Sequence, residues 1–146
     1  MNVTVGVDLV EVARIAYVLQ CHPVRFLTRH FTAAEQTECG RNPERLATRW
    51  AAKEAAAKAL GTGIGTVSWH EIEVLCRPSG APVLALHGAA GRLAGKQGWQ
   101  SWSVSLSHTG EHAVAVVAGV GWGAGTDAGD HHAGSMPYAY DQPIPA

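Results

Sequence analysis

The chain has 146 residues, with 11 lysines and arginines against 12 acidic residues and an apolar fraction of 47%. This length favours a single domain, which buries roughly 70% of the surface that the unfolded chain exposes. The apolar fraction excludes a wholly disordered chain, and the lack of an internal period excludes collagen-like and repeat architectures. No apolar run approaches membrane-spanning length, so no membrane partner is expected.

The compartment is predicted from the N-terminus and the cysteines. The first ten residues lack the basic segment and the long apolar stretch of an export signal. Cys21, Cys39 and Cys76 are odd in number, widely spaced and without a zinc-binding pattern. Both features favour a reducing cytoplasm. The cysteines are then expected to be small buried apolar residues or incidental ones.

Charge is unevenly distributed along the chain. Seven of the 11 basic residues lie between Arg25 and Lys58, and the last 26 residues contain no lysine or arginine. A basic middle suits a phosphate-bearing ligand or an acidic protein partner, and a merely solvated surface is the alternative. The acidic residues interspersed within it argue against nucleic acid as a partner.

The first half of the chain predicts one strand and three helices. Period-two alternation over residues 3–10 indicates a strand with Asp8 on the face opposite Val3, Val5, Val7 and Leu9. Helical spacing follows over residues 11–20 and 28–39, and Thr32 and Glu35 in the latter have the spacing of a capping box. The strongest helix spans about residues 43–60, because it is rich in alanine and is followed by Gly61.

The second half predicts a sheet and then a change of character. Strands over residues 71–76 and 82–86 flank a turn, and a weak helix covers residues 87–96. Serines alternate with apolar residues over 101–107, which indicates a half-buried strand, and the apolar segment 113–120 suits a central strand. Residues 1–120 are therefore predicted to form the domain, and residues 121–146, rich in Gly and Pro, a flexible tail.

The long helix carries an anomaly, because Lys53 lies in the middle of its apolar stripe. A buried ammonium group is costly unless it is paired or contacts a ligand. The alternative is that Lys53 extends to solvent while Glu54 pairs with Lys58 on the surface. The helix pattern does not decide between these two interpretations.

Asp8 is the second anomaly, a carboxylate near the end of an apolar strand. If strand and helix pack together, Asp8 and Glu54 provide two hard oxygen ligands, which is the usual protein contribution to a Mg²⁺ site. The alternative is an Asp8 that caps the following helix. A third candidate is the turn at Ser107-His108-Thr109, whose hydroxyls, imidazole and backbone amides suit phosphate contact.

Four stretches, taken in order, resemble the holo-acyl-carrier-protein synthase family of small trimeric 4′-phosphopantetheinyl transferases. The matching stretches are Gly6-Val7-Asp8-Leu9-Val10-Glu11 with Arg14-Ile15, Phe31-Thr32 with Glu35, Arg49-Trp50-Ala51-Ala52-Lys53-Glu54-Ala55 leading to Lys58-Ala59-Leu60-Gly61-Thr62-Gly63, and Ser107-His108-Thr109. Their order and spacing match the family pattern over about residues 5–120.

The resemblance implies Mg²⁺-dependent transfer of the phosphopantetheine arm of coenzyme A to a serine of apo acyl carrier protein, with release of adenosine 3′,5′-bisphosphate. The carrier belongs to fatty acid or to secondary-metabolite (polyketide) synthesis. By position, Asp8 and Glu54 match the metal ligands, and Lys58 joins them as a catalytic group. Arg49, Lys58 and Ser107-His108-Thr109 match the coenzyme A contacts. Arg14 matches the helix that docks the carrier, and Glu54 or a metal-bound water is the candidate base.

The expected fold is α+β, with the long alanine-rich helix packed on an antiparallel sheet. The resemblance implies a cytoplasmic homotrimer with each active site between neighbouring subunits. Two alternatives remain: a non-catalytic coenzyme A or nucleotide-binding module, and an interaction domain whose basic stretch docks an acidic partner.

Overall fold

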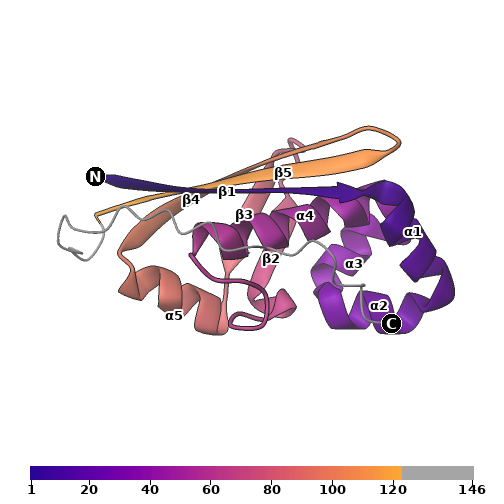
Figure 1. Cartoon of the computed structure of the whole chain (residues 1–146), viewed down its shortest axis with the longest axis horizontal. Coiled ribbons are helices and arrows are strands. Elements are labelled where there is room, and N and C mark those ends of the chain that lie inside the picture. Colours follow the sequence, from indigo (N-terminus) through magenta and orange to yellow (C-terminus); the bar gives the residue numbers. More distant parts are fainter. Residues whose placement is uncertain (123–146) are drawn as a thin grey trace.

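The computed structural model describes residues 1–122, and Figure 1 shows how their elements are arranged. The elements in chain order are β1 (Asn2–Glu11), α1 (Val12–Cys21), α2 (Pro23–His30), α3 (Ala33–Cys39), α4 (Pro43–Ala59), the 3-10 helix η1 (Trp69–Glu71), β2 (Ile72–Cys76), β3 (Pro82–Leu86), α5 (Gly88–Lys96), β4 (Trp99–His108) and β5 (His112–Gly121). The predicted tail lies outside the described residues except for Gly121, which ends β5, and Trp122.

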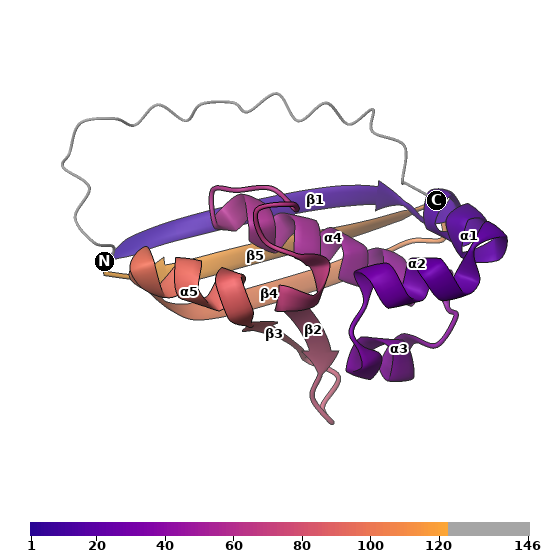
Figure 2. The same cartoon turned by 90° about the horizontal axis from the view of Figure 1, so that it is seen from below.

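The larger sheet has the antiparallel order β1-β5-β4, so the apolar strand β5 is central, as its sequence predicted. Helix α4 runs across one face of this sheet, α1 to α3 gather at one end of it, and α5 lies toward the other (Figure 1). Seen from below, the β2–β3 hairpin extends away from the sheet beside α3 (Figure 2). The predicted α+β fold, a long alanine-rich helix on an antiparallel sheet, is confirmed.

Helix α4 begins and ends as its sequence predicted. The Asn42 side chain accepts a hydrogen bond from the Arg45 amide, Pro43 occupies the first turn, and Gly61 follows with a φ of 72°. From Leu46 to Ala59 every residue is buried except Glu54 and Lys58. The alanines therefore allow close packing on nearly all sides, and the helix opens toward solvent only at these two charged residues.

Strand β1 presents its small residues, not its valines, to α4. A Cβ on Gly6 would lie 1.8 Å from the Ala55 carbonyl oxygen, and the Thr4 hydroxyl donates to the Ala59 carbonyl at 2.6 Å. The opposite face of β1 is exposed, where Val3, Val5, Val7 and Leu9 are 53–60% accessible, and it continues onto Val116 and Val120 of β5. A contiguous apolar surface of this kind marks an interaction site.

The region before α4 holds one correct and one incomplete prediction. Thr32 and Glu35 form the predicted capping box at the start of α3. The predicted helix over residues 28–39 is in fact two helices, because α2 ends at His30 and α3 starts at Ala33. Helix α2 was missed since its start is marked only by Pro23 and not by a side-chain cap.

Helix α2 contributes a buried histidine to an aromatic cluster. His30 is 2% exposed, and its ring centroid lies 4.8 Å from that of Trp50 and 5.0 Å from that of Trp69. Its Nδ1 lies 2.8 Å from the Phe26 carbonyl oxygen. Burial lowers the pKa of His30 from 6.5 to about 4, so the ring is neutral in the folded chain at neutral pH.

We expect the chain to lose stability as the pH falls from about 6.5 toward 4, because His30 binds a proton in the unfolded state but stays neutral in the folded state. The contribution of His30 is on the order of 2–3 kcal/mol across this window. His30→Phe fits the same cluster without titrating. The free energy of unfolding of the wild type, relative to that of His30→Phe, should fall by that amount between pH 7.5 and pH 4.5, both measured with urea. A constant difference would contradict the assignment.

Candidate active site

Asp8 and Lys58 form an ion pair between β1 and α4. Lys58 Nζ lies 2.9 Å from Asp8 Oδ1 and also donates to the Val7 carbonyl at 3.1 Å. The Asp8 side chain is 6% exposed and that of Lys58 is 18% exposed. Asp8 does not cap α1, whose N-cap is Glu11 and has no side-chain hydrogen bond. The capping alternative for Asp8 is therefore wrong.

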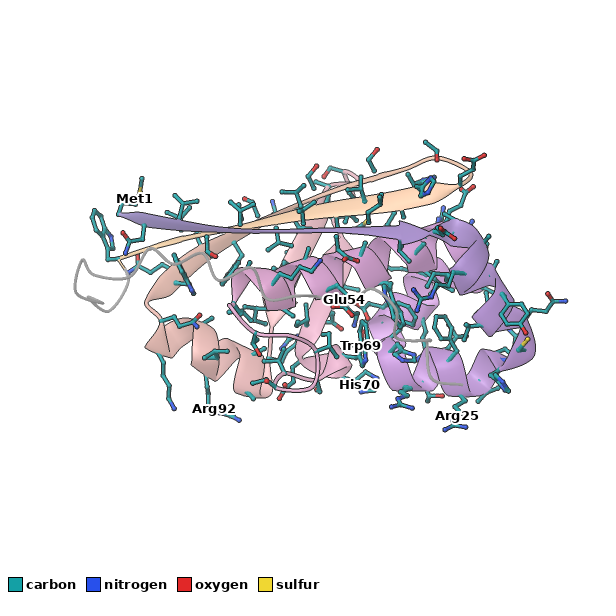
Figure 3. The ribbon with its side chains drawn as sticks, in the orientation of Figure 1. Met1, Arg25, Glu54, Trp69, His70 and Arg92 are labelled. Carbon is teal, nitrogen blue, oxygen red and sulfur yellow. The ribbon has the colours of Figure 1, made fainter. Side chains whose placement is uncertain are left out.

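Glu54 lies one turn before Lys58 on the same face of α4, near the middle of the molecule (Figure 3). The pKa of Glu54 is raised to about 7, chiefly by burial and then by the negative charge of Asp8, while the positive charge of Lys58 opposes the shift. Among the described residues none donates a hydrogen bond to the Glu54 carboxylate. Lys58, one turn from Glu54, pairs with Asp8, and Asp8 lies near enough to Glu54 for its charge to act on that carboxylate.

Lys53, one residue earlier, points elsewhere and has a structural partner. Its side chain is 0% exposed, and Nζ lies 2.7 Å from Glu35 Oε2 and 2.8 Å from the Trp69 carbonyl oxygen. The suggestion that Lys53 extends to solvent is wrong. Pairing with Glu35 inside the protein explains why the Lys53 ammonium is buried, and no ligand is needed to explain it.

The other basic residue predicted on α4, Arg49, lies away from the Asp8–Glu54 pair. Its Nη2 lies 3.4 Å from Glu38 Oε2 and 3.1 Å from Cys76 Sγ, while its Nε is buried without a hydrogen-bond partner. Sequence reasoning missed Glu38, which also accepts the Cys76 amide and so joins α3 to β2. The structure therefore gives Arg49 protein partners and leaves one of its polar atoms unsatisfied.

The remaining predicted site residues lie at the β4–β5 turn and on α1. Ser107, His108 and Thr109 are exposed at the β4–β5 turn, and His108 Nδ1 lies 3.5 Å from Glu44 Oε2. Strand β5 lies between β4 and β1, and within residues 1–122 no contact joins Ser107, His108 or Thr109 to Asp8 or Glu54. Arg14 lies on α1 and is partly exposed.

The carboxylate pair suits one metal better than others. Asp8 and Glu54 offer hard oxygen atoms, and their mutual repulsion, which raises the pKa of Glu54, is relieved by a divalent cation. Within residues 1–122 no group of three or more His, Cys, Asp or Glu side chains is arranged to hold a metal ion. Two carboxylates completed by waters and substrate phosphates are typical of Mg²⁺ and not of Zn²⁺.

Comparisons with known proteins define the class. A model of the 4′-phosphopantetheinyl transferase superfamily matches residues 4–117. The chain is 48% identical over 123 residues to a holo-[acyl-carrier-protein] synthase of Herpetosiphon aurantiacus, covering 80% of this chain and 97% of the relative. The relative from Koribacter versatilis is 47% identical over 116 residues, covering 77% and 93%.

Solved structures give the same result. The holo-[acyl-carrier-protein] synthase of Helicobacter pylori, in complex with coenzyme A, superposes with a TM-score of 0.73 at 32% identity and covers 80% of this chain and 99% of that one. The Neisseria meningitidis synthase has the same TM-score and identity, with 80% and 97% covered. The chain therefore belongs to the holo-acyl-carrier-protein synthase family and is a 4′-phosphopantetheinyl transferase.

Proposed function

We propose that the protein transfers the 4′-phosphopantetheine group of coenzyme A to a serine of apo acyl carrier protein, in a Mg²⁺-dependent reaction that releases adenosine 3′,5′-bisphosphate. The observation that carries this proposal is the meeting of Asp8 and Glu54, from segments 46 residues apart, beside Lys58 at the single opening of α4. Similarity to synthases solved with coenzyme A supports the substrate.

In this proposal Asp8 and Glu54 hold the metal ion, which when bound neutralises charge on the pyrophosphate oxygens. Lys58 contributes a second positive charge from its place beside Asp8. The carrier serine must lose a proton as its oxygen bonds to phosphorus and the bond to the leaving phosphate breaks. Glu54 is the candidate acceptor for that proton; its pKa of about 7 holds without a metal ion and falls when a cation is bound.

Coenzyme A contacts are assigned to Arg49, Lys58 and the segment Ser107-His108-Thr109. The unsatisfied Nε of Arg49 leaves one donor for a ligand oxygen. Within the described residues the β4–β5 turn makes no contact with Asp8 or Glu54, and the apolar face of β1 and β5 is exposed. Both observations support a homotrimer in which a neighbouring subunit supplies the turn.

Arg14 is assigned to docking of the carrier protein. It lies on α1, which follows directly after β1 and stands at the end of the sheet nearer to Asp8 (Figure 1). A partly exposed arginine there suits an acidic partner. We place the reaction in the cytoplasm, which the three free cysteines favour. In residues 1–122 no helix is long and apolar enough to cross a membrane. The carrier belongs to fatty acid or to polyketide synthesis.

The proposal is tested by incubating the protein with coenzyme A, Mg²⁺ and a set of apo carrier proteins, each weighed by mass spectrometry. We expect at least one carrier to gain the mass of phosphopantetheine, with adenosine 3′,5′-bisphosphate released in equal amount. Chelation of the metal with EDTA should stop the gain, and added Mg²⁺ should restore it. Tight coenzyme A binding without a mass gain on any carrier would favour a non-catalytic binding module instead.

A further inference from the structure

Helix α4 carries Glu54, but the carboxylate of Glu54 has no hydrogen-bond donor of its own among the described residues. Its location is therefore determined by the rotation and the height of α4 against the sheet. Side-chain ends lie about 5–6 Å from a helix axis, so a rotation of about 10° moves a carboxylate by about 1 Å. A shift of this size is enough to disturb a catalytic or metal site.

The residue next to Glu54 is the most firmly anchored side chain on α4. Lys53 Nζ contacts Glu35 Oε2 at 2.7 Å and donates to the Trp69 carbonyl at 2.8 Å. Glu35 in turn accepts the Val74 amide at 2.8 Å through Oε1 and the Thr32 amide at 2.9 Å through Oε2. One buried ammonium thus connects α4 to α3, η1 and β2.

The opposite side of α4 is held by β1. Gly6 brings the strand backbone against Ala55 and Ala59, and Thr4 donates to the Ala59 carbonyl. Contacts on two sides of a helix fix its rotation, whereas packing of alanines on one side allows it to roll. The alanines of α4 are small and similar, so they provide little resistance to rolling.

We infer that the buried Lys53–Glu35 pair is a positioning device, which sets the rotation of α4 and so holds Glu54 beside Asp8. Lys53 is then a positioning residue and not a catalytic one, since its ammonium faces Glu35 and the Trp69 carbonyl. A buried ion pair can often be replaced by uncharged residues of similar volume without loss of stability. Stability alone therefore does not explain why a charged pair stands here.

The test uses the full chain and the uncharged pair Lys53→Met/Glu35→Gln, in which the glutamine oxygen still accepts the Val74 amide. Binding of Mn²⁺ is measured by electron paramagnetic resonance, together with the midpoint of thermal unfolding. Because the Thr32 amide loses its acceptor, we expect the midpoint to fall about as far as in the control below, and Mn²⁺ binding to weaken by about tenfold. The matched control is Glu71→Gln, because Glu71 accepts the Ser68 and Ala89 amides and makes no hydrogen bond to α4. It should lower the midpoint and leave Mn²⁺ binding unchanged.

A second variant keeps the test decisive if the uncharged pair does not fold. Lys53→Arg keeps the charge pair but lengthens it, and we expect about threefold weaker Mn²⁺ binding. Wild-type Mn²⁺ affinity in a folded variant of either kind would overturn the inference. This inference rests on the proposed function, and the two fail differently: a wild-type chain that binds no Mn²⁺ contradicts the proposed metal site itself.

Discussion

Replacing Glu54 with glutamine is expected to reduce transfer by about 10²–10⁴-fold, because the change removes both a proposed metal ligand and the candidate proton acceptor. The same change should not weaken the fold. Burial and the charge of Asp8 raise the pKa of Glu54 to about 7, so the ionised carboxylate costs free energy in the folded chain above that pH. In metal-free buffer at pH 8 we expect the free energy of unfolding of Glu54→Gln, measured with urea, to equal that of the wild type or to exceed it by up to about 3 kcal/mol.

The control for this prediction, Glu71→Gln, should lower stability and leave transfer unchanged. Glu71→Gln also removes one carboxylate, but Glu71 is ionised and accepts two backbone amides that start η1 and α5. Its loss should cost about 1 kcal/mol of stability and leave transfer near the wild-type rate. Transfer is measured by carrier mass at a fixed time. Full activity in Glu54→Gln would remove Glu54 from the site, and a collapse of its stability would assign it a structural role.

The local structure of the chain was largely predictable where short-range signals dominate. The capping box of Thr32 and Glu35, the asparagine and proline that start α4, and the glycine that ends it depend on residues within one turn of each other. Backbone amides at a helix start need acceptors, and these side chains supply them wherever they occur. Helix α2 lacks such a cap, and it was missed.

Which face of a strand is buried was not predictable from alternation alone. Strand β1 has a valine face and a face of small and polar residues, and the hydrophobic pattern favours burial of the valines. The structure instead packs Gly6 and Asp8 on α4. The backbones of β1 and α4 lie so close together at Gly6 that a larger side chain at this position would not fit. The valines remain exposed, available for the contact with other chains that we propose, and a pattern within one chain does not reveal such a contact.

The candidate site was predictable in part, for a related reason. Asp8 was singled out as an anomaly and Glu54 as its candidate partner, and in the structure the charge of Asp8 acts on Glu54. The partner of Lys53 was not predictable, since Glu35 is already explained by its capping box and lies 18 residues away. A glutamate can serve both roles because its Oε2 accepts from the Thr32 amide and from Lys53 together, while its Oε1 accepts the Val74 amide. Pairing of this kind depends on tertiary packing and not on spacing.

Gly6→Ala is expected to destabilise the chain by about 3 kcal/mol or more, the upper range for overpacking a core. The new Cβ would lie 1.8 Å from the Ala55 oxygen and 2.9 Å from the Ala59 nitrogen. Both atoms are backbone, so β1 must move away from α4. The matched control is Gly95→Ala on α5, where a Cβ meets nothing within 4 Å. That change should be neutral or stabilising by up to about 1 kcal/mol.

The effect of Gly6→Ala should extend from stability to the site, because Asp8 lies two residues further along the same face of β1. Any displacement of the strand from α4 lengthens the 2.9 Å contact between Asp8 and Lys58 and separates Asp8 from Glu54. We expect a thermal midpoint lower by about 10 °C and, at a temperature where the variant is folded, transfer reduced at least tenfold. Loss of stability with full transfer by the folded fraction would show that the carboxylates tolerate movement of β1. Since both ligands depend on one helix–strand contact, that result would contradict the shared metal site on which the transferase mechanism rests.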